Sequence, residues 1–367
     1  MMRVFIEPTD VWLFRDGRSF RAGEDHWARS LFPPTSNTIQ GVIRSKVLFD
    51  SGVDLTAYAN GAPEAQVLIE QIGGPGVSDG TLRIRGPFLA RWESSKVVRY
   101  YPLPADLVRD KESGLYHSLA PVRGVPFRAN WPDDGPLLPL WAGLEEYEEA
   151  RGWVREDALR AYLTEGVPPS AKAVLPDRYF YTGEPRFGIR MERTAHRPDD
   201  GYLFEVEYVR LREGAGLDVE VEGIPRWEPK QGVLGIGGEA RAGYYEVLDE
   251  PALAFPVPQT LGPRFKVYFA TPTYFGRGWQ PANWGVWFEG EVRLVAAAID
   301  RARRIGGWDI VQDEDKPIHA YVPAGSVYFF ESEGQVIYSQ EPVTEKGGEI
   351  GYGQVFFGTW EYIEWEG

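Results

Sequence analysis

Two glycine-rich turns of one pattern constrain the fold of this chain more than any other feature. GGEARAGYYEV spans residues 237–247 and GGEIGYGQVFF spans residues 347–357, so both fit G-G-E-x-x-x-G-x-x-x-[Val/Phe], and they begin 110 residues apart. Each turn leads into a run that is typical of a β-strand. Such glycines form plain turns, close backbone contacts or shelves of amide groups that hold a phosphate or a partner segment. Because there are two matched copies, we expect a duplicated chain in which the turns share a role. The glycines concerned are Gly237, Gly238, Gly243, Gly347, Gly348, Gly351 and Gly353.

The residues before the first turn mix strand and helix patterns. RVFIE, residues 3–7, is typical of a short strand. In LFPPTSNTIQGVIRSKVLFD, Thr35 or Ser36 can cap a helix, because apolar residues recur at helical spacing after them. REDALRAYLTEG, residues 155–166, indicates a second helix closed by its final glycine, and YLFEVEYVRL, residues 202–211, alternates as a strand does.

The two halves of the chain share an outline. Each has an opening strand, which is RFKVYFATP (264–272) in the second half, then further strands, then the glycine turn and a closing strand. Many strands with few helices predict an α+β fold with antiparallel sheets, inserted loops and glycine-rich turns, and the ferredoxin-like split βαβ is the simplest such module. The proline-rich stretch 250–263 is the best linker. We predict an N-terminal ferredoxin-like domain with insertions over residues 1–255 and a C-terminal ferredoxin-like domain over residues 256–367.

Composition excludes several classes of protein and site. The 367 residues contain no cysteine, so disulfides, thiolate metal sites and cysteine nucleophiles are excluded. The four histidines lack zinc-ligand spacing, and we expect neither a metal nor a cofactor. Neither a signal peptide nor a membrane-spanning stretch is expected, which favours the cytoplasm. A net charge of −15 argues against a free-standing nonspecific nucleic-acid binder, although arginines gather locally.

Local clusters of arginines and hydroxyl side chains are candidates for phosphate binding. They lie in the Asp-Gly loop FRDGRSF, at the helix start PPTSNT, in the strand FGIRMERTAHR and in the first glycine turn. A solvated turn, ordinary helix capping, and cross-strand ion pairs with Glu205 and Glu207 are the structural alternatives. The candidates are Arg15, Arg18, Ser36, Thr38, Arg190, Arg193, Thr194 and Arg241.

One histidine has a catalytic alternative. His26 lies in the loop after the first strand, beside the arginines of FRDGR. There an imidazole could act as general base on a ribose 2′-hydroxyl, which is metal-independent RNA cleavage. A structural or exposed histidine is the other interpretation.

Several of these motifs occur together in one known family. EPTDVWLFRDGRSF, LFPPTSNTIQGVIRS, GGEAR, TPTYFGRGW, GGWD (306–309) and VPAGSVYFFE follow one another in this order. In this order they resemble the RAMP superfamily of CRISPR proteins, most closely the third-subunit family of the Cmr complex, the type III-B RNA-guided effector. The resemblance runs from Glu7 to about Gly358, which is nearly the whole chain.

The resemblance implies both a fold and a role. It implies two ferredoxin-like domains related to RNA-recognition motifs, each with a glycine-rich loop before its closing strand. It implies a structural subunit without nuclease activity of its own, which binds the 5′ handle of the CRISPR RNA and pairs with the large polymerase-like subunit beside the RAMP backbone subunits. Arg44, in the helix motif, joins the expected handle contacts. A CRISPR-RNA-processing endoribonuclease that uses His26 is the alternative within the same superfamily.

Overall fold

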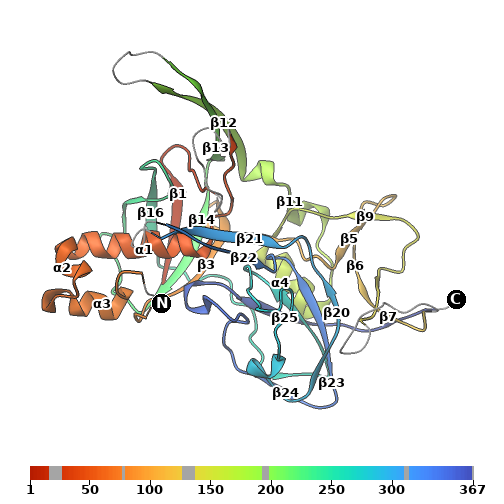
Figure 1. Ribbon diagram of the computed structural model, residues 1–367. Helices are drawn as coiled ribbons and strands as arrows, with labels where there is room; N and C mark the ends of the chain where they lie inside the picture. The colour runs from red at the N-terminus through yellow and green to blue at the C-terminus, as the bar shows by residue number, and fades with distance from the viewer. Residues whose placement is uncertain (16–26, 77–78, 126–136, 192–197, 310–313, 366–367) are drawn as a thin grey trace. The chain divides into compact units, whose positions relative to one another are not determined.

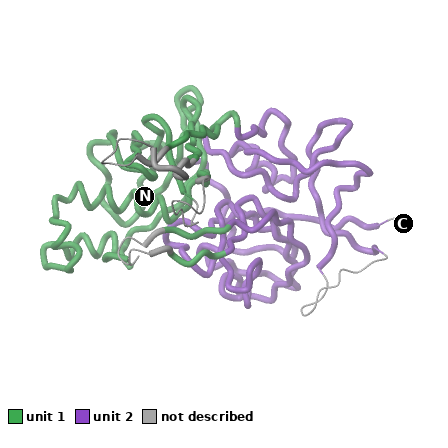
Figure 2. The backbone as a smooth tube through the Cα atoms, turned by 45° about the horizontal axis from the view of Figure 1, so that its top comes forward, with its two compact units in different colours: residues 1–97, 178–251, 304–319 green, residues 98–177, 252–303, 320–367 purple. Residues whose placement is uncertain are grey.

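The computed structural model describes residues 1–15, 27–76, 79–125, 137–191, 198–309 and 314–365. These residues form two compact units that are each assembled from three separate stretches of chain (Figure 2). Unit 1 comprises residues 1–97, 178–251 and 304–319, and unit 2 comprises residues 98–177, 252–303 and 320–367. The predicted division at residues 255 and 256 stays a prediction.

Unit 1 is built on an antiparallel sheet whose central strand is the opening one. Its strands follow the order β3-β14-β1-β16-β15, and each neighbouring pair is antiparallel. The closing strand β16 therefore lies directly beside the opening strand β1 (Figure 1). The bounds are β1 Met2–Pro8, β3 Arg83–Glu93, β14 Ala215–Glu222, β15 Gln231–Gly235 and β16 Ala242–Leu248.

The long helix α1, Ser36–Ser51, packs on one face of this sheet (Figure 1). Its buried side chains, among them Ile39 and Ile43, join the same core as Val4 of β1 and Val219 of β14. The apolar residues that recur at helical spacing in the sequence thus form the face of α1 that is buried, and this burial stabilises the helix. α2 (Leu55–Ala59), η1 (Pro63–Ala65) and α3 (Gln66–Ile72) follow α1.

Two hairpins complete unit 1. β12 (Tyr181–Met191) and β13 (Pro198–Leu211) form a long antiparallel ribbon, beside which the short strand β2 (Trp27–Ala28) lies parallel to β13. β21 (Arg303–Asp309) pairs with β22 (Glu314–Tyr321), and this pair supplies the third stretch of the unit.

Unit 2 repeats the strand arrangement of unit 1. Its main sheet follows the order β20-β23-β18-β25, so the opening strand β18 again lies beside the closing strand β25 and all pairs are antiparallel. Phe265, Tyr328 and Phe330 are fully buried in its aromatic core. The bounds are β18 Arg264–Phe269, β20 Val292–Ala298, β23 Val327–Ser332 and β25 Val355–Thr359.

Short strands, short 3-10 helices and the helix α4 make up the rest of unit 2 among the described residues. The helix α4, Glu156–Glu165, ends at Gly166 in a left-handed conformation, as the sequence predicts. The remaining elements are β4 Lys96–Pro102, β5 Leu107–Asp110, β6 Tyr116–Ser118, β7 Ala120–Arg123, β8 Leu140–Trp141, β9 Tyr147–Glu149, β10 Trp153–Arg155, η2 Ala171–Ala173, β11 Val174–Leu175, η3 Asp177–Tyr179, β17 Thr260–Leu261, η4 Trp284–Val286, β19 Phe288–Glu289, β24 Val336–Tyr338, η5 Gly348–Ile350 and β26 Ile363–Glu364.

The expected mixed α+β class, with mostly antiparallel strands and few helices, is confirmed.

Candidate functional site

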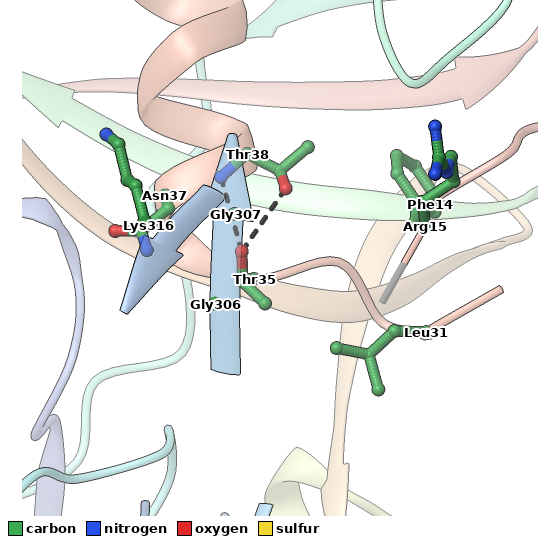
Figure 3. Close-up of a pocket in the computed structure, with 9 residues that line it drawn as sticks. All are labelled: Phe14, Arg15, Leu31, Thr35, Asn37, Thr38, Gly306, Gly307 and Lys316. Atoms are coloured by element: carbon green, nitrogen blue, oxygen red, sulfur yellow. Dashed lines mark hydrogen bonds between the residues drawn. The ribbon is translucent and has the colours of Figure 1, made fainter. Parts of the chain in front are cut away.

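A cavity of about 170 Å³ opens at the start of α1 in unit 1 (Figure 3). Three separate parts of the unit surround it: residues on either side of segment 16–26, the first turn of α1, and the strand pair β21–β22. Its lining residues are Phe14, Arg15, Leu31, Thr35, Asn37, Thr38, Gly306, Gly307 and Lys316.

The start of α1 presents hydrogen-bond donors to this cavity. Thr35 is the N-cap, and its Oγ1 accepts the Thr38 N–H at 3.3 Å and lies 3.2 Å from the Thr38 hydroxyl (Figure 3). The first turn holds no acidic residue. The partial positive charge of the helix N-terminus is therefore not neutralised within the helix, and an anion at this point would be stabilised.

Two cationic side chains stand at the same cavity. Arg15 and Lys316 are both exposed and both line it. Arg15 follows a fixed anchor, because Phe14 is buried and its carbonyl accepts the Leu31 N–H at 2.7 Å. Gly306 and Gly307 contribute only backbone to the wall, which leaves room for a ligand close to β21. Cations, hydroxyls and a helix start together suit a phosphate group.

Two predicted contact residues are engaged inside the fold. The Ser36 hydroxyl is buried and donates to the Gly86 carbonyl at 3.2 Å, which ties α1 to β3. Arg44 donates to the Gly74 carbonyl, just beyond the end of α3, at 2.5 Å and to the hydroxyl of Tyr58 in α2 at 2.9 Å. These bonds give both residues a structural role, and contact with RNA stays a prediction for each.

Arg241, in the first glycine turn, belongs to a network of charges. Its guanidinium lies 3.7 Å from Glu239 and 3.9 Å from Asp10, and it stacks over the Tyr208 ring with 4.8 Å to the centroid. The side chain of Tyr208 donates to Glu239. Burial, followed by this hydrogen bond, raises the pKa of Tyr208.

The same network continues at the base of the β12–β13 ribbon. Glu184 accepts hydrogen bonds from Arg210 and, at 2.6 Å, from Arg186. These bonds lower the pKa of Glu184 from 4.5 to about 2. Arg210 also lies 3.1 Å from Asp10, so the ribbon and the glycine turn share one carboxylate.

Both glycine turns pack against other backbone in their own unit. Gly237 has φ +86°, and a Cβ there would lie 2.7 Å from the Leu13 carbonyl oxygen, while the Gly238 N–H donates to that same oxygen at 2.8 Å. In the second turn Gly353 has φ +69°, and its N–H donates to the Pro272 carbonyl oxygen at 3.0 Å. Each turn then enters the strand that pairs with the opening strand of its unit. Their use as phosphate shelves stays a prediction.

Some predicted residues are not placed by the structure. Arg18, His26, Arg193 and Thr194 lie outside the described residues, and Arg190 is placed only by its backbone in β12. Among the described residues, no group of three or more histidine, aspartate or glutamate side chains could hold a metal ion. No helix in the described part of the chain is long and apolar enough to cross a membrane.

Sequence reasoning missed the part of the cavity that comes from β21 and β22. Lys316 carried no signal, whereas Gly306 and Gly307 belong to the GGWD motif that the family resemblance includes. Asn37 belongs to the helix-start motif PPTSNT, but it was not among the candidate residues.

Comparison with known proteins identifies the family. A family model described as CRISPR-associated protein (Cas_Cmr3) matches residues 4–360. The chain belongs to this family. The family resemblance expected from the motifs is therefore confirmed, and it extends over both units.

A solved structure shows a related fold. A chain of "Cryo-EM structure of the Type III-B Cmr-beta bound to cognate target RNA and AMPPnP, state 1" aligns with a TM-score of 0.51 and 14% identity, over 89% of this chain and 86% of the other. A chain of "Cryo-EM structure of the Type III-B Cmr-beta bound to cognate target RNA" aligns with a TM-score of 0.46 and 16% identity over the same shares. No curated protein sequence matches the chain.

Proposed function

We propose that this Cas_Cmr3-family protein is a non-catalytic structural subunit of a type III-B CRISPR effector complex. In this role it binds the 5′ handle of the CRISPR RNA, pairs with the large polymerase-like subunit and lies beside the RAMP backbone subunits. Family membership over residues 4–360 carries the proposal. The fold similarity to a chain of the Cmr-beta complex supports it.

The cavity at the start of α1 is the best candidate for the RNA contact. An RNA backbone that crosses the cavity would meet the hydroxyl of Thr38, with the Arg15 side chain on one side of it and the Lys316 side chain on the other (Figure 3). Contacts to the RNA backbone position the strand without reading its sequence. Recognition of the constant sequence of the handle would also require contacts to its bases. We assign the cavity the positioning role.

The charge of the chain indicates how such a cavity would operate. With a net charge of −15 the whole protein repels RNA at long range, so a few local cations give weak binding to the isolated chain. Neighbouring subunits would supply the remaining positive surface. We therefore expect tight binding of the handle only in the assembled complex.

We also infer that each unit is a diverged ferredoxin-like module. In that fold the strands, numbered along the chain, lie in the antiparallel order 4-1-3-2. β16-β1-β14-β3 in unit 1 and β25-β18-β23-β20 in unit 2 follow this order. α1 occupies the first crossover of unit 1. Between β14 and β16, where the second helix of the module would come in chain order, the chain has the edge strand β15 instead.

Purification from the host tests the proposed function. The full chain would carry an affinity tag and be isolated at moderate salt, after which its RNA and proteins would be sequenced. We expect small RNAs with one constant 5′ end and a large polymerase-like protein. A chain that elutes alone and cuts added repeat RNA, with cleavage abolished by His26→Ala, would instead establish the endoribonuclease.

A further inference from the structure

A second surface of unit 1 lies on the sheet face opposite α1, at the β15 edge. It is a shallow cleft of about 420 Å³, whose side-chain walls come from β1, β16 and β15. The register explains how it forms. Val233 faces Tyr244, and Tyr244 in turn faces Glu7; likewise Glu246 lies between its partners on β15 and β1. Cross-strand partners share a face, so these side chains line one surface.

The two faces of the sheet differ sharply at this edge. Val233 and Tyr244 are 55% and 53% exposed, whereas their sequence neighbours Leu234 and Tyr245 are 4% and 3% exposed in the core beneath α1. Two adjacent large apolar groups on a strand pair therefore stand in solvent. Phe5 of β1, which is buried, also lines the cleft, on the side towards the centre of the sheet. Two such side chains next to each other on a sheet face offer apolar area to a partner, although alone they do not define an interface.

The carboxylates in the cleft indicate that the group that binds there is positively charged. Glu7 and Glu246 are both half-buried and both line it. Neither forms an ion pair with any other residue that the structure describes. Burial, together with the charge of Glu246, raises the pKa of Glu7, so a cation placed between them would relieve both effects. The same charges repel phosphate, which excludes RNA as the natural occupant.

The strand at this edge is open to pairing. β15 is the outermost strand of the sheet among the described residues. Its sequence, QGVLG, contains neither the charged residues nor the proline that commonly protect sheet edges. Its outward amide and carbonyl groups can therefore accept one more strand.

We propose that the β15 edge and its cleft dock a strand-forming segment of a protein partner that places a Lys or Arg side chain between Glu7 and Glu246. Main-chain bonds to β15 hold the segment, and the apolar contacts with Val233 and Tyr244 fix its register. This inference deepens the proposed function, because it gives the subunit a defined surface for a neighbouring protein.

Site-specific photocrosslinking tests the inference in the assembled complex. Val233 is replaced by the photocrosslinker p-benzoylphenylalanine in the full chain. In the control variant the same replacement is made at Val67, which is 68% exposed on α3. We expect position 233 to capture one peptide of a partner protein that contains Lys or Arg and forms a strand. Capture of RNA alone, of a second copy of this chain, or of the same peptide from position 67 would overturn the proposal.

Charge removal gives the second measurement. The double variant Glu7→Gln and Glu246→Gln keeps the side-chain shapes and removes mutual repulsion, so it should fold. Capture at position 233 should fall about tenfold in it, and it should stay unchanged in the control Glu213→Gln, an exposed carboxylate in a turn. Unchanged capture in the double variant would overturn the proposed cation.

The two proposals fail in different ways. A complex that keeps its guide RNA while position 233 captures no protein overturns only the docking inference. A chain that captures a protein strand at position 233 but carries no guide RNA overturns only the proposed function.

Discussion

Thr35 caps α1 by accepting the N–H of Thr38 at 3.3 Å, and both residues line the cavity that we assign to the RNA backbone. The bond joins stability to function, since the same turn of helix positions the donors of the site. Thr35→Ala removes the acceptor and should lower the free energy of unfolding by about 1 kcal/mol. Thr35→Ser keeps the oxygen and should lower it much less. Urea denaturation followed by tryptophan fluorescence measures both, and equal loss in the two variants would contradict the cap.

The cations of the cavity should control retention of guide RNA. Arg15→Ala combined with Lys316→Ala removes two phosphate contacts and should weaken binding of the handle to the complex by at least about tenfold. The slope of log K against log salt should fall by roughly 1.4, because each contact to single-stranded RNA contributes about 0.7. Filter binding at several salt concentrations measures both quantities.

A matched pair of surface cations serves as the control for that double variant. Arg226 and Lys230 are similarly exposed in unit 1, and each pairs with Asp249. Arg226→Ala with Lys230→Ala should leave the affinity and the salt slope unchanged. If both double variants behave alike, the cavity has no special role in RNA binding.

The opening strand, the helix α1 and the strand β13 of unit 1 could be predicted from the sequence, but the composition of the site could not. Spacing located α1 and its cap, because helix burial depends on residues close in sequence. The groups that engage Ser36 and Arg44 lie far along the chain, at Gly86 and Gly74, and no local pattern reports them. Lys316 reaches the cavity for the same reason, through a hairpin that joins unit 1 from near the end of the chain.

A side chain should be tolerated at Gly235, at the end of β15, but not at Gly237 in the first glycine turn. Gly237→Ala forces a positive φ on alanine and brings its Cβ to 2.7 Å from the Leu13 carbonyl oxygen, so the free energy of unfolding should fall by more than about 1 kcal/mol. At Gly235 a Cβ meets no heavy atom within 4 Å. Gly235→Ala should therefore change stability by less than about 0.5 kcal/mol. Thermal denaturation of the two variants would contradict the packing role of Gly237 if their midpoints coincide.

A buried ion pair in unit 2 gives a prediction about stability alone. Lys266 Nζ lies 2.8 Å from Asp106 Oδ2 and 2.7 Å from the Tyr162 hydroxyl, and all three side chains are buried. Lys266→Met leaves the carboxylate without its cation and should lower the free energy of unfolding by roughly 3–5 kcal/mol. Adding Asp106→Leu removes that unpaired charge, so the double variant should be more stable than Lys266→Met. Guanidinium denaturation compares them, and additive losses would show that the two residues are not coupled.

Glu184 predicts how the β12–β13 ribbon responds to acid. Hydrogen bonds from Arg210 and Arg186 lower its pKa from 4.5 to about 2 in the folded chain. A carboxyl whose pKa is depressed by folding stabilises the fold fully above its unfolded value, and this contribution is lost as the pH falls from about 5 towards 2. Because the group is partly exposed, the effect is modest and screened by salt. Glu184→Gln should therefore flatten the acid limb of the stability curve and leave Arg210 to pair with Asp10.

The comparison needs unfolding midpoints of both proteins between pH 2.5 and 7, at low and high salt. Parallel curves for the wild type and the variant would mean that the arginines do not depress the pKa of Glu184 in the folded chain.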